Sequence, residues 1–195
     1  MEQRKLIVLA GHNRAGWKKY PHFSDPGAVS GVHDGNKDNE HYLMERLVSP
    51  PFTELKKEHD NIYLMDFTYN LQGKIDWINK NCTKFDCVVE FHANAAQDYT
   101  ANGSEVFYIE NGIRSYTWSK RLIDIICHNM DTKNRGIKTS NNTRHGRLGI
   151  IDDTVTYDFL IELGFITNQS DYNKIKVNGQ KTVQNVCEYL LHNIK

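Results

Sequence analysis

The chain has 195 residues, of which 39% are hydrophobic and 25% charged, and this composition is typical of one globular domain spanning residues 1–195. Lys and Arg (24) balance Asp and Glu (24), which excludes the basic field that drives binding to nucleic acid or to an anionic membrane. A core at this length buries roughly 70% of the unfolded surface without help from a partner chain, so we expect a monomer.

The first predicted element is a buried strand at residues 6–10. It follows Arg4 and Lys5, but five apolar residues are too few for the core of a signal peptide, which needs about 7 to 15. Apolar runs elsewhere are also short, far below the roughly 18 residues of a membrane span. We therefore expect synthesis in the cytoplasm without a signal peptide, and no membrane partner.

A long polar loop, residues 13–39, leads to a helix that begins near Glu40 behind Asp38 or Asn39 as N-cap. Ser49-Pro50-Pro51 is expected to break or kink this helix, because proline lacks the backbone N–H. In the long loop, three aromatic residues interleave with basic ones and could either form a rim facing the substrate or pack the loop onto the domain: Trp17, Tyr20 and Phe23.

Further short apolar runs predict strands at residues 62–67, 87–91, 105–109 and 159–161. Helical spacing predicts helices at residues 71–80, 116–130 and 182–194. A second long polar stretch, at residues 131–147, is expected to be a loop. Alternating strands and helices indicate an α/β fold, with a mainly parallel (mixed) sheet and helices on both faces. The four cysteines form no CxxC pair, and we expect them to be buried free thiols rather than disulfides.

Polar residues follow three of the apolar runs: His12, His92 and Glu162. The carboxyl ends of parallel strands meet at one edge of a sheet, so these side chains are expected to lie close together. Two imidazoles and one carboxylate suit a catalytic zinc ion with an open position for water. Glu162 cannot be both a ligand and a free base, so Glu40 is the candidate third ligand, with Glu45 as the fallback.

Glu90 is also embedded in an apolar strand and points to the same side as His92. It could support that ligand or form a buried ion pair, and the pattern does not separate the two. The remaining histidines are expected to be solvated: His22, His33, His41, His59, His128, His145 and His192.

An ordered set of sequence blocks extends from Gly11 almost to the last helix. The blocks are Gly11-His12, Asp25-Pro26-Gly27-Ala28, Glu40, Phe91-His92-Ala93-Asn94-Ala95, residues 103–108, Ser115, Asn134-Arg135-Gly136 and residues 160–168. This set resembles the zinc-dependent N-acetylmuramoyl-L-alanine amidases of type 3, which cut peptidoglycan between the muramic lactyl group and the first L-alanine. Departures from the family pattern, such as Leu9-Ala10 before Gly11, concern substrate contacts more than the metal site.

The resemblance implies Zn²⁺ on His12, Glu40 and His92, with Glu162 as the catalytic base and acid. Asn94 and Arg135 are the expected substrate-binding residues, as donors to the oxyanion. Two other activities stay open: a zinc peptidase that cuts the stem peptide, and a wall-binding module without catalysis. The chain suits a phage endolysin that reaches the wall after release, or a bacterial autolysin whose export signal has been trimmed.

Overall fold

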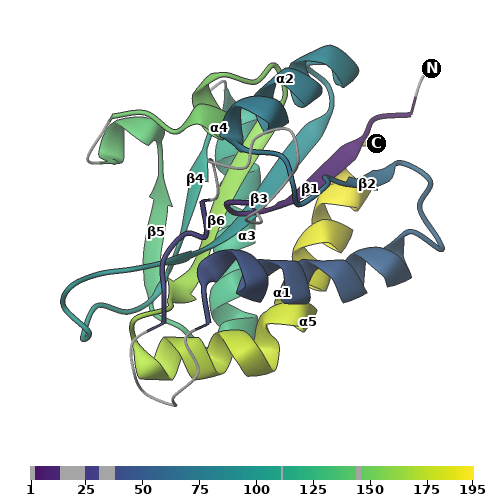
Figure 1. The fold of residues 1–195 in the computed structure, drawn as a ribbon. Helices are drawn as coiled ribbons and strands as arrows, with labels where there is room; N and C mark the ends of the chain where they lie inside the picture. The colour runs from purple at the N-terminus through teal and green to yellow at the C-terminus, as the bar shows by residue number, and fades with distance from the viewer. Residues whose placement is uncertain (1–2, 14–24, 31–37, 111, 144–145) are drawn as a thin grey trace.

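The computed structural model describes residues 3–13, 25–30, 38–110, 112–143 and 146–195. One six-stranded sheet has the strand order β2-β1-β3-β6-β4-β5, and helices cover both of its faces (Figure 1). The strands are β1 (Leu6–Ala10), β2 (Ile62–Leu64), β3 (Cys87–Asn94), β4 (Ser104–Tyr108), β5 (Asn134–Lys138) and β6 (Tyr157–Phe165). The helices are α1 (Glu40–Leu55), α2 (Leu71–Asn81), α3 (Ile113–Met130), α4 (Gly149–Asp152) and α5 (Gln169–Asn193), with a 3₁₀ turn η1 (Ser140–Asn142).

The sheet is mostly parallel, as the sequence predicts. Strands β2, β1, β3 and β6 run in one direction, whereas β4 is antiparallel to β6 and parallel to β5. Every residue of β1 is buried, because helices cover both faces of the inner strands, and this explains the unbroken apolar run. The predicted mixed α/β architecture is confirmed.

The two faces of the sheet have different coverings. Helices α1, α3 and α5 bury the larger core against one face, and α2 and α4 cover the other face, at the top of Figure 1. Successive residues of a strand point to opposite faces, and Val88 packs with α2 on the smaller face while Val89 packs in the larger core. Glu90 and His92 therefore share the face that α2 covers.

The two prolines are expected to break or kink the first helix, and the structure shows that they do not break it. Helix α1 continues through Pro50 and Pro51 to Leu55. Without an N–H at residue 50, the carbonyl of Arg46 loses its helical partner, and Gln180 of α5 donates to it instead (Nε2–O 3.2 Å). A side chain on the neighbouring helix thus replaces the missing backbone donor.

Other boundaries differ because packing, not apolar pattern, decides them. Strand β5 lies inside the predicted polar loop, since it is an edge strand with little buried surface. Helix α5 begins at Gln169, capped by the side chain of Asn168, rather than at residue 182. The four cysteines are free, three buried and one partly buried. Among the described residues, no helix is both long and apolar enough to cross a membrane.

Candidate metal and catalytic site

Three segments that are far apart in the sequence meet at the carboxyl edge of the parallel strands. His12 follows β1, His92 lies in β3, and Glu40 opens α1. His12 Nε2 lies 3.0 Å from Glu40 Oε2, and His92 Nδ1 lies 2.8 Å from Glu40 Oε1. One nitrogen or oxygen from each residue lies within 4.8 Å of the others. The structure thus brings together the three residues predicted as metal ligands.

Two glycines make room for this cluster. A Cβ on Gly11 would lie 2.5 Å from Nδ1 of His92. The His92 ring can therefore pack against the backbone at residue 11 only because that residue is a glycine. Gly27 has φ +69°, and a Cβ there would lie 2.4 Å from the His12 ring. His12 itself has φ 61°, a left-handed conformation that costs free energy for a residue with a side chain.

Glu40 is held as a carboxylate by several donors. Its Oε2 accepts from the backbone N–H of Ala28 and its Oε1 from that of Ala93, each at 3.0 Å. Burial opposes ionisation, but hydrogen bonds and charge from His12 and His92 outweigh burial and hold the pKa of Glu40 well below its usual value. The first turn of a helix also favours a negative charge.

Each histidine has a second carboxylate on its outer nitrogen. His12 Nδ1 lies 2.9 Å from Asp25 Oδ2, and His92 Nε2 lies 3.2 Å from Glu90 Oε2. Histidines that bind metals have this arrangement, because the outer carboxylate fixes the ring and its tautomer. The inner nitrogens are then lone-pair donors that converge with Glu40, and this donor set fits a zinc ion.

Within the cluster, the inner nitrogens of the two histidines lie against carboxylate oxygens of Glu40. Burial lowers the pKa of His92, but Glu90 and Glu40 outweigh it and raise the pKa well above its usual value. The pKa of His12 is raised as well, since Glu40 outweighs its burial. The cluster therefore attracts positive charge strongly, in the form of protons when no metal is bound.

Glu162 lies beside the cluster on the adjacent strand. It is opposite His92 in the register of β3 and β6. Its Oε2 is buried and accepts no hydrogen bond from the described residues. Burial raises the pKa of Glu162 to about 8, with Glu40 and Glu105 adding to the rise and His92 opposing it. A carboxyl group in this state can exchange a proton near neutral pH.

The two predicted substrate-binding residues, Asn94 and Arg135, share one partner. Asn94 Nδ2 donates to Glu105 Oε1 at 3.0 Å, and Arg135 Nε donates to Glu105 Oε2 at 2.9 Å. Glu105 faces Glu162 across β4 and β6, and also accepts from Lys138 at 2.6 Å. Lys138 was not predicted, because its strand lies in a stretch that the sequence presents as a polar loop.

Two expectations about histidine and glutamate in α1 are corrected. His41 is 1% exposed rather than solvated, and its Nδ1 lies 3.1 Å from the carbonyl oxygen of Gly11. Glu45 lies 3.6 Å from His41 Nε2 and not in the cluster, so it does not replace Glu40. Residues 41 and 45 are one helical turn apart and share a face of α1. The loop aromatics with two open roles (Trp17, Tyr20 and Phe23) and the histidines His22, His33 and His145 lie outside the described residues.

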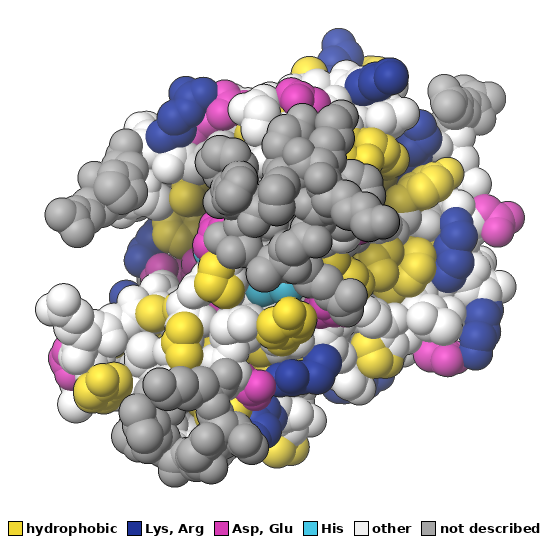
Figure 2. All heavy atoms as spheres, viewed as in Figure 1, with side chains coloured by type: hydrophobic (Ala, Val, Ile, Leu, Met, Phe, Trp, Pro, Cys, Tyr) yellow, Lys and Arg dark blue, Asp and Glu magenta, His cyan; other side chains and the backbone are white. Residues whose placement is uncertain are grey.

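A small cavity of about 160 Å³ lies at the cluster, lined by His12, Asp25, Lys74, Glu90 and His92 among others. Histidine surface is visible near the centre of the face shown in Figure 2. Hydrophobic side chains lie beside it in this view.

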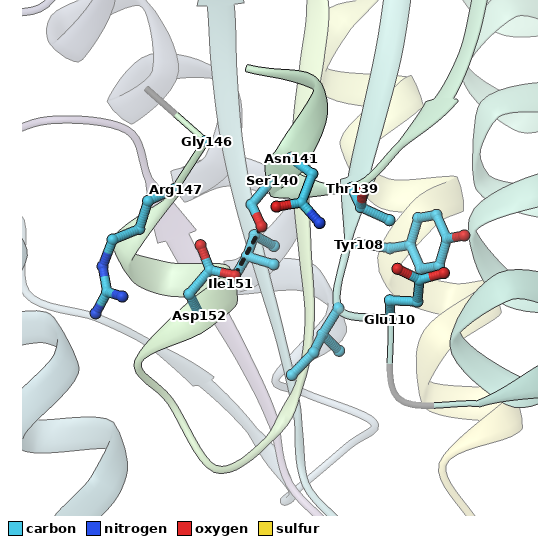
Figure 3. Close-up of a pocket in the computed structure, with 10 residues that line it drawn as sticks. Tyr108, Glu110, Thr139, Ser140, Asn141, Gly146, Arg147, Ile151 and Asp152 are labelled. Atoms are coloured by element: carbon cyan, nitrogen blue, oxygen red, sulfur yellow. Dashed lines mark hydrogen bonds between the residues drawn. The ribbon is translucent and has the colours of Figure 1, made fainter. Parts of the chain in front are cut away.

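A larger cavity of about 390 Å³ lies elsewhere (Figure 3). Tyr108, which lines it, pairs with Phe159 near the start of β6, so this cavity is at the opposite edge of the sheet from Glu162. Two of its polar groups bind each other, since Ser140 Oγ donates to Asp152 at 2.8 Å, and Arg147 pairs with Asp153 outside the lining. The smaller cavity, by contrast, is lined by two of the three clustered residues, His12 and His92.

Comparisons with known proteins point to one family. The model of the family described as N-acetylmuramoyl-L-alanine amidase matches residues 7–191. A Staphylococcus aureus protein named "Probable autolysin PH" is 25% identical over 91% of this chain and 36% of its own length. The N-acetylmuramoyl-L-alanine amidase LytC of Bacillus subtilis is 33% identical over 57% of this chain and 21% of its own. The chain thus spans about a third or less of these relatives.

Solved structures share the fold. Cwp6 from Clostridium difficile superposes with a TM-score of 0.74 at 24% identity, covering 95% of this chain and 29% of that one. The catalytic domain of the CD27L endolysin targeting Clostridia Difficile gives a TM-score of 0.71 at 23% identity, covering 97% of both chains. At these identities the likeness shows the fold alone.

Proposed function

The chain belongs to the N-acetylmuramoyl-L-alanine amidase family, and from this premise we propose that it hydrolyses the amide bond between N-acetylmuramic acid and L-alanine in peptidoglycan. One observation carries the proposal: two histidines and a glutamate converge at the sheet edge, with a second glutamate beside them. The substrate is the wall polymer, and the place of action is the cell wall.

His12, Glu40 and His92 would hold a zinc ion, through Nε2 of His12 and Nδ1 of His92. Asp25 and Glu90 lie beside the opposite ring nitrogens, at 2.9 Å and 3.2 Å, and would favour the tautomer that leaves the inner nitrogens free for the metal. Bound zinc supplies Lewis-acid chemistry, since it polarises the scissile carbonyl and favours loss of a proton from water.

Glu162 would move the protons. As a carboxylate it takes a proton from the attacking water, whose oxygen bonds to the lactyl carbonyl carbon. When the carbon–nitrogen bond breaks, Glu162 returns the proton to the nitrogen of L-alanine. The products are a free lactyl carboxylate and a stem peptide with a free amino terminus.

Asn94 of β3 and Arg135 of β5, which meet at Glu105 of β4, are proposed to bind the substrate. Both are anchored by Glu105, and the side chain of Arg135 is 31% exposed, so it remains accessible to a ligand. A donor fixed by its own hydrogen bonds stabilises developing negative charge without having to reorganise. These two residues are also the proposed source of oxyanion stabilisation.

The test is digestion of purified sacculi followed by mass spectrometry. Free lactyl groups and intact stem peptides support the amidase. Cleavage within the stem peptide would indicate a zinc peptidase instead of an amidase, because the same residues can hydrolyse any accessible amide. Binding of zinc and wall with no released fragments would indicate a wall-binding module.

A further inference from the structure

A buried ion pair lies directly behind the metal cluster. Lys74 Nζ of α2 lies 2.7 Å from Glu90 Oε1 of β3, and each side chain is only 4% exposed. Desolvating two charges is costly, and such a pair is often no more stabilising than apolar residues of similar size. Its contribution to folding therefore does not explain its position, and its contacts suggest another role.

Both members of the pair contact segments that carry metal ligands. The second oxygen of Glu90 lies 3.2 Å from His92 Nε2. Lys74 donates to the carbonyl oxygens of Ala10 at 2.8 Å and of His12 at 2.9 Å. With Glu90 as the third acceptor, all three hydrogens of the ammonium group are used.

The contact with His12 matters because the backbone there is strained. His12 has φ 61°, and the preceding Gly11 leaves no side chain to brace the turn. A donor that binds the carbonyls on both sides of Gly11 holds this turn in place. One ammonium group thus joins the turn that carries His12 to the strand that carries His92.

We propose that Lys74 and Glu90 form a positioning pair for the metal centre: Glu90 orients the His92 ring, and Lys74 holds both Glu90 and the His12 turn. The inference rests on the proposed function, since it concerns the residues assigned to zinc. It assigns to Lys74 and Glu90 no contact with the substrate.

The charge of Lys74 and its positioning role predict opposite effects on zinc affinity. Lys74 is a cation near a site for a dication, so its charge alone would weaken zinc binding, and its removal would tighten binding. If positioning dominates, removal of the pair weakens binding, and losses of 10- to 100-fold are typical for such supporting partners. When both members of the pair are removed, one positive and one negative charge are lost, so the net charge near the site is unchanged and a fall in zinc affinity reports the lost positioning.

The main variant is Lys74→Met/Glu90→Leu, because Lys74→Met alone would leave a carboxylate buried without its cation. Zinc affinity is measured by competition with a chelator, and the stability of the metal-free protein by thermal unfolding. Lys80→Met is the matched control, since it is the same change at an exposed position of the same helix. We expect affinity to fall by about 10- to 100-fold in the double variant and to stay unchanged in the control.

Glu90→Gln is the second variant, since it keeps the shape of the side chain if the double variant does not fold. It leaves a neutral acceptor for Lys74 and His92, and we expect a loss of several-fold. Wild-type or tighter affinity in a folded variant overturns the inference and leaves the proposed function intact. If the unmodified chain binds no zinc, the proposed metal centre is overturned and the positioning role with it.

Discussion

Two carboxyl groups on strand β6, Asp158 and Glu162, lie on the same face of the sheet but in different surroundings. Asp158 accepts from Thr154 Oγ1 at 2.7 Å and from Thr156 Oγ1 at 2.5 Å. Glu162 Oε2 is enclosed and has no donor among the described residues. Burial raises both pKa values, to about 7 for Asp158 and to about 8 for Glu162.

The two carboxyl groups differ in whether neighbouring side chains satisfy their oxygens. Asp158 lies at the start of the strand, where hydroxyl groups from the same segment satisfy it. Glu162 lies near the carboxyl end of the strand, opposite His92, and none of the residues that the structure describes donates to its Oε2. A raised pKa alone therefore does not distinguish the two groups, and the proposed catalytic role of Glu162 is supported instead by its unsatisfied acceptor and its place beside His92.

The largest effect is expected for Glu162→Gln. Loss of a general base and acid should lower turnover by about 100- to 10,000-fold, while zinc stays bound because Glu162 is not a ligand. Dye release from labelled wall gives the rate, and metal analysis gives the zinc content. Asp158→Asn is the control at the other carboxyl group and should keep near-normal activity. Near-normal turnover in Glu162→Gln would remove this residue from the mechanism.

Asp158→Asn should instead change how stability depends on pH. The folded protein holds a proton on Asp158 up to about pH 7, whereas the unfolded chain loses it near the ordinary value of 3.8. The free energy of unfolding supplied by this group is thus fully present below about pH 4 and is lost as the pH rises to about 7. Three pKa units correspond to about 4 kcal/mol.

Chemical denaturation of metal-free wild type and Asp158→Asn from pH 4 to 8 measures this contribution. The stability of the wild type relative to the variant should decline across that range and then level off. If the free energies of unfolding of the two proteins change with pH in parallel, Asp158 is ionised in the folded protein. Its pKa would then not be raised as that of Glu162 is.

The smallest effect is expected for Thr154→Val, which keeps the shape of the side chain and deletes one donor to Asp158. A buried acceptor that loses one of two donors should cost about 1–3 kcal/mol in the free energy of unfolding. Wall-degrading activity should be unchanged, because Thr154 precedes the start of β6, whereas Glu162 lies near the other end of that strand. A loss of activity at wild-type stability would contradict the structural role of Asp158.

The sequence predicts most of the fold and the main cluster because both depend on strands with a strong apolar signal. His12, His92 and Glu162 each follow or end such a run, so parallel strands bring them together without any local motif. For Glu90 the sequence leaves support of a ligand and a buried ion pair open, and the structure shows that it makes both contacts.

Other features carry no such signal. Lys74 is an ordinary lysine in an amphipathic helix, and only the packing of α2 on the sheet buries it against Glu90. Strand β5 is polar and lies at the sheet edge, so Lys138 and its contact with Glu105 could not be predicted. His41 is buried because its face of α1 packs beneath Gly11, which depends on how the helix is rotated.

Zinc stoichiometry tests the convergence of His12, Glu40 and His92 most directly. The purified chain and His12→Ala are loaded with zinc, freed of excess metal and measured by elemental analysis, with His128→Ala as a control at an exposed histidine. We predict one zinc ion per chain for the wild type and the control, and a loss of bound zinc for His12→Ala. Equal zinc in His12→Ala and the wild type, or none in either, would contradict the proposed metal centre.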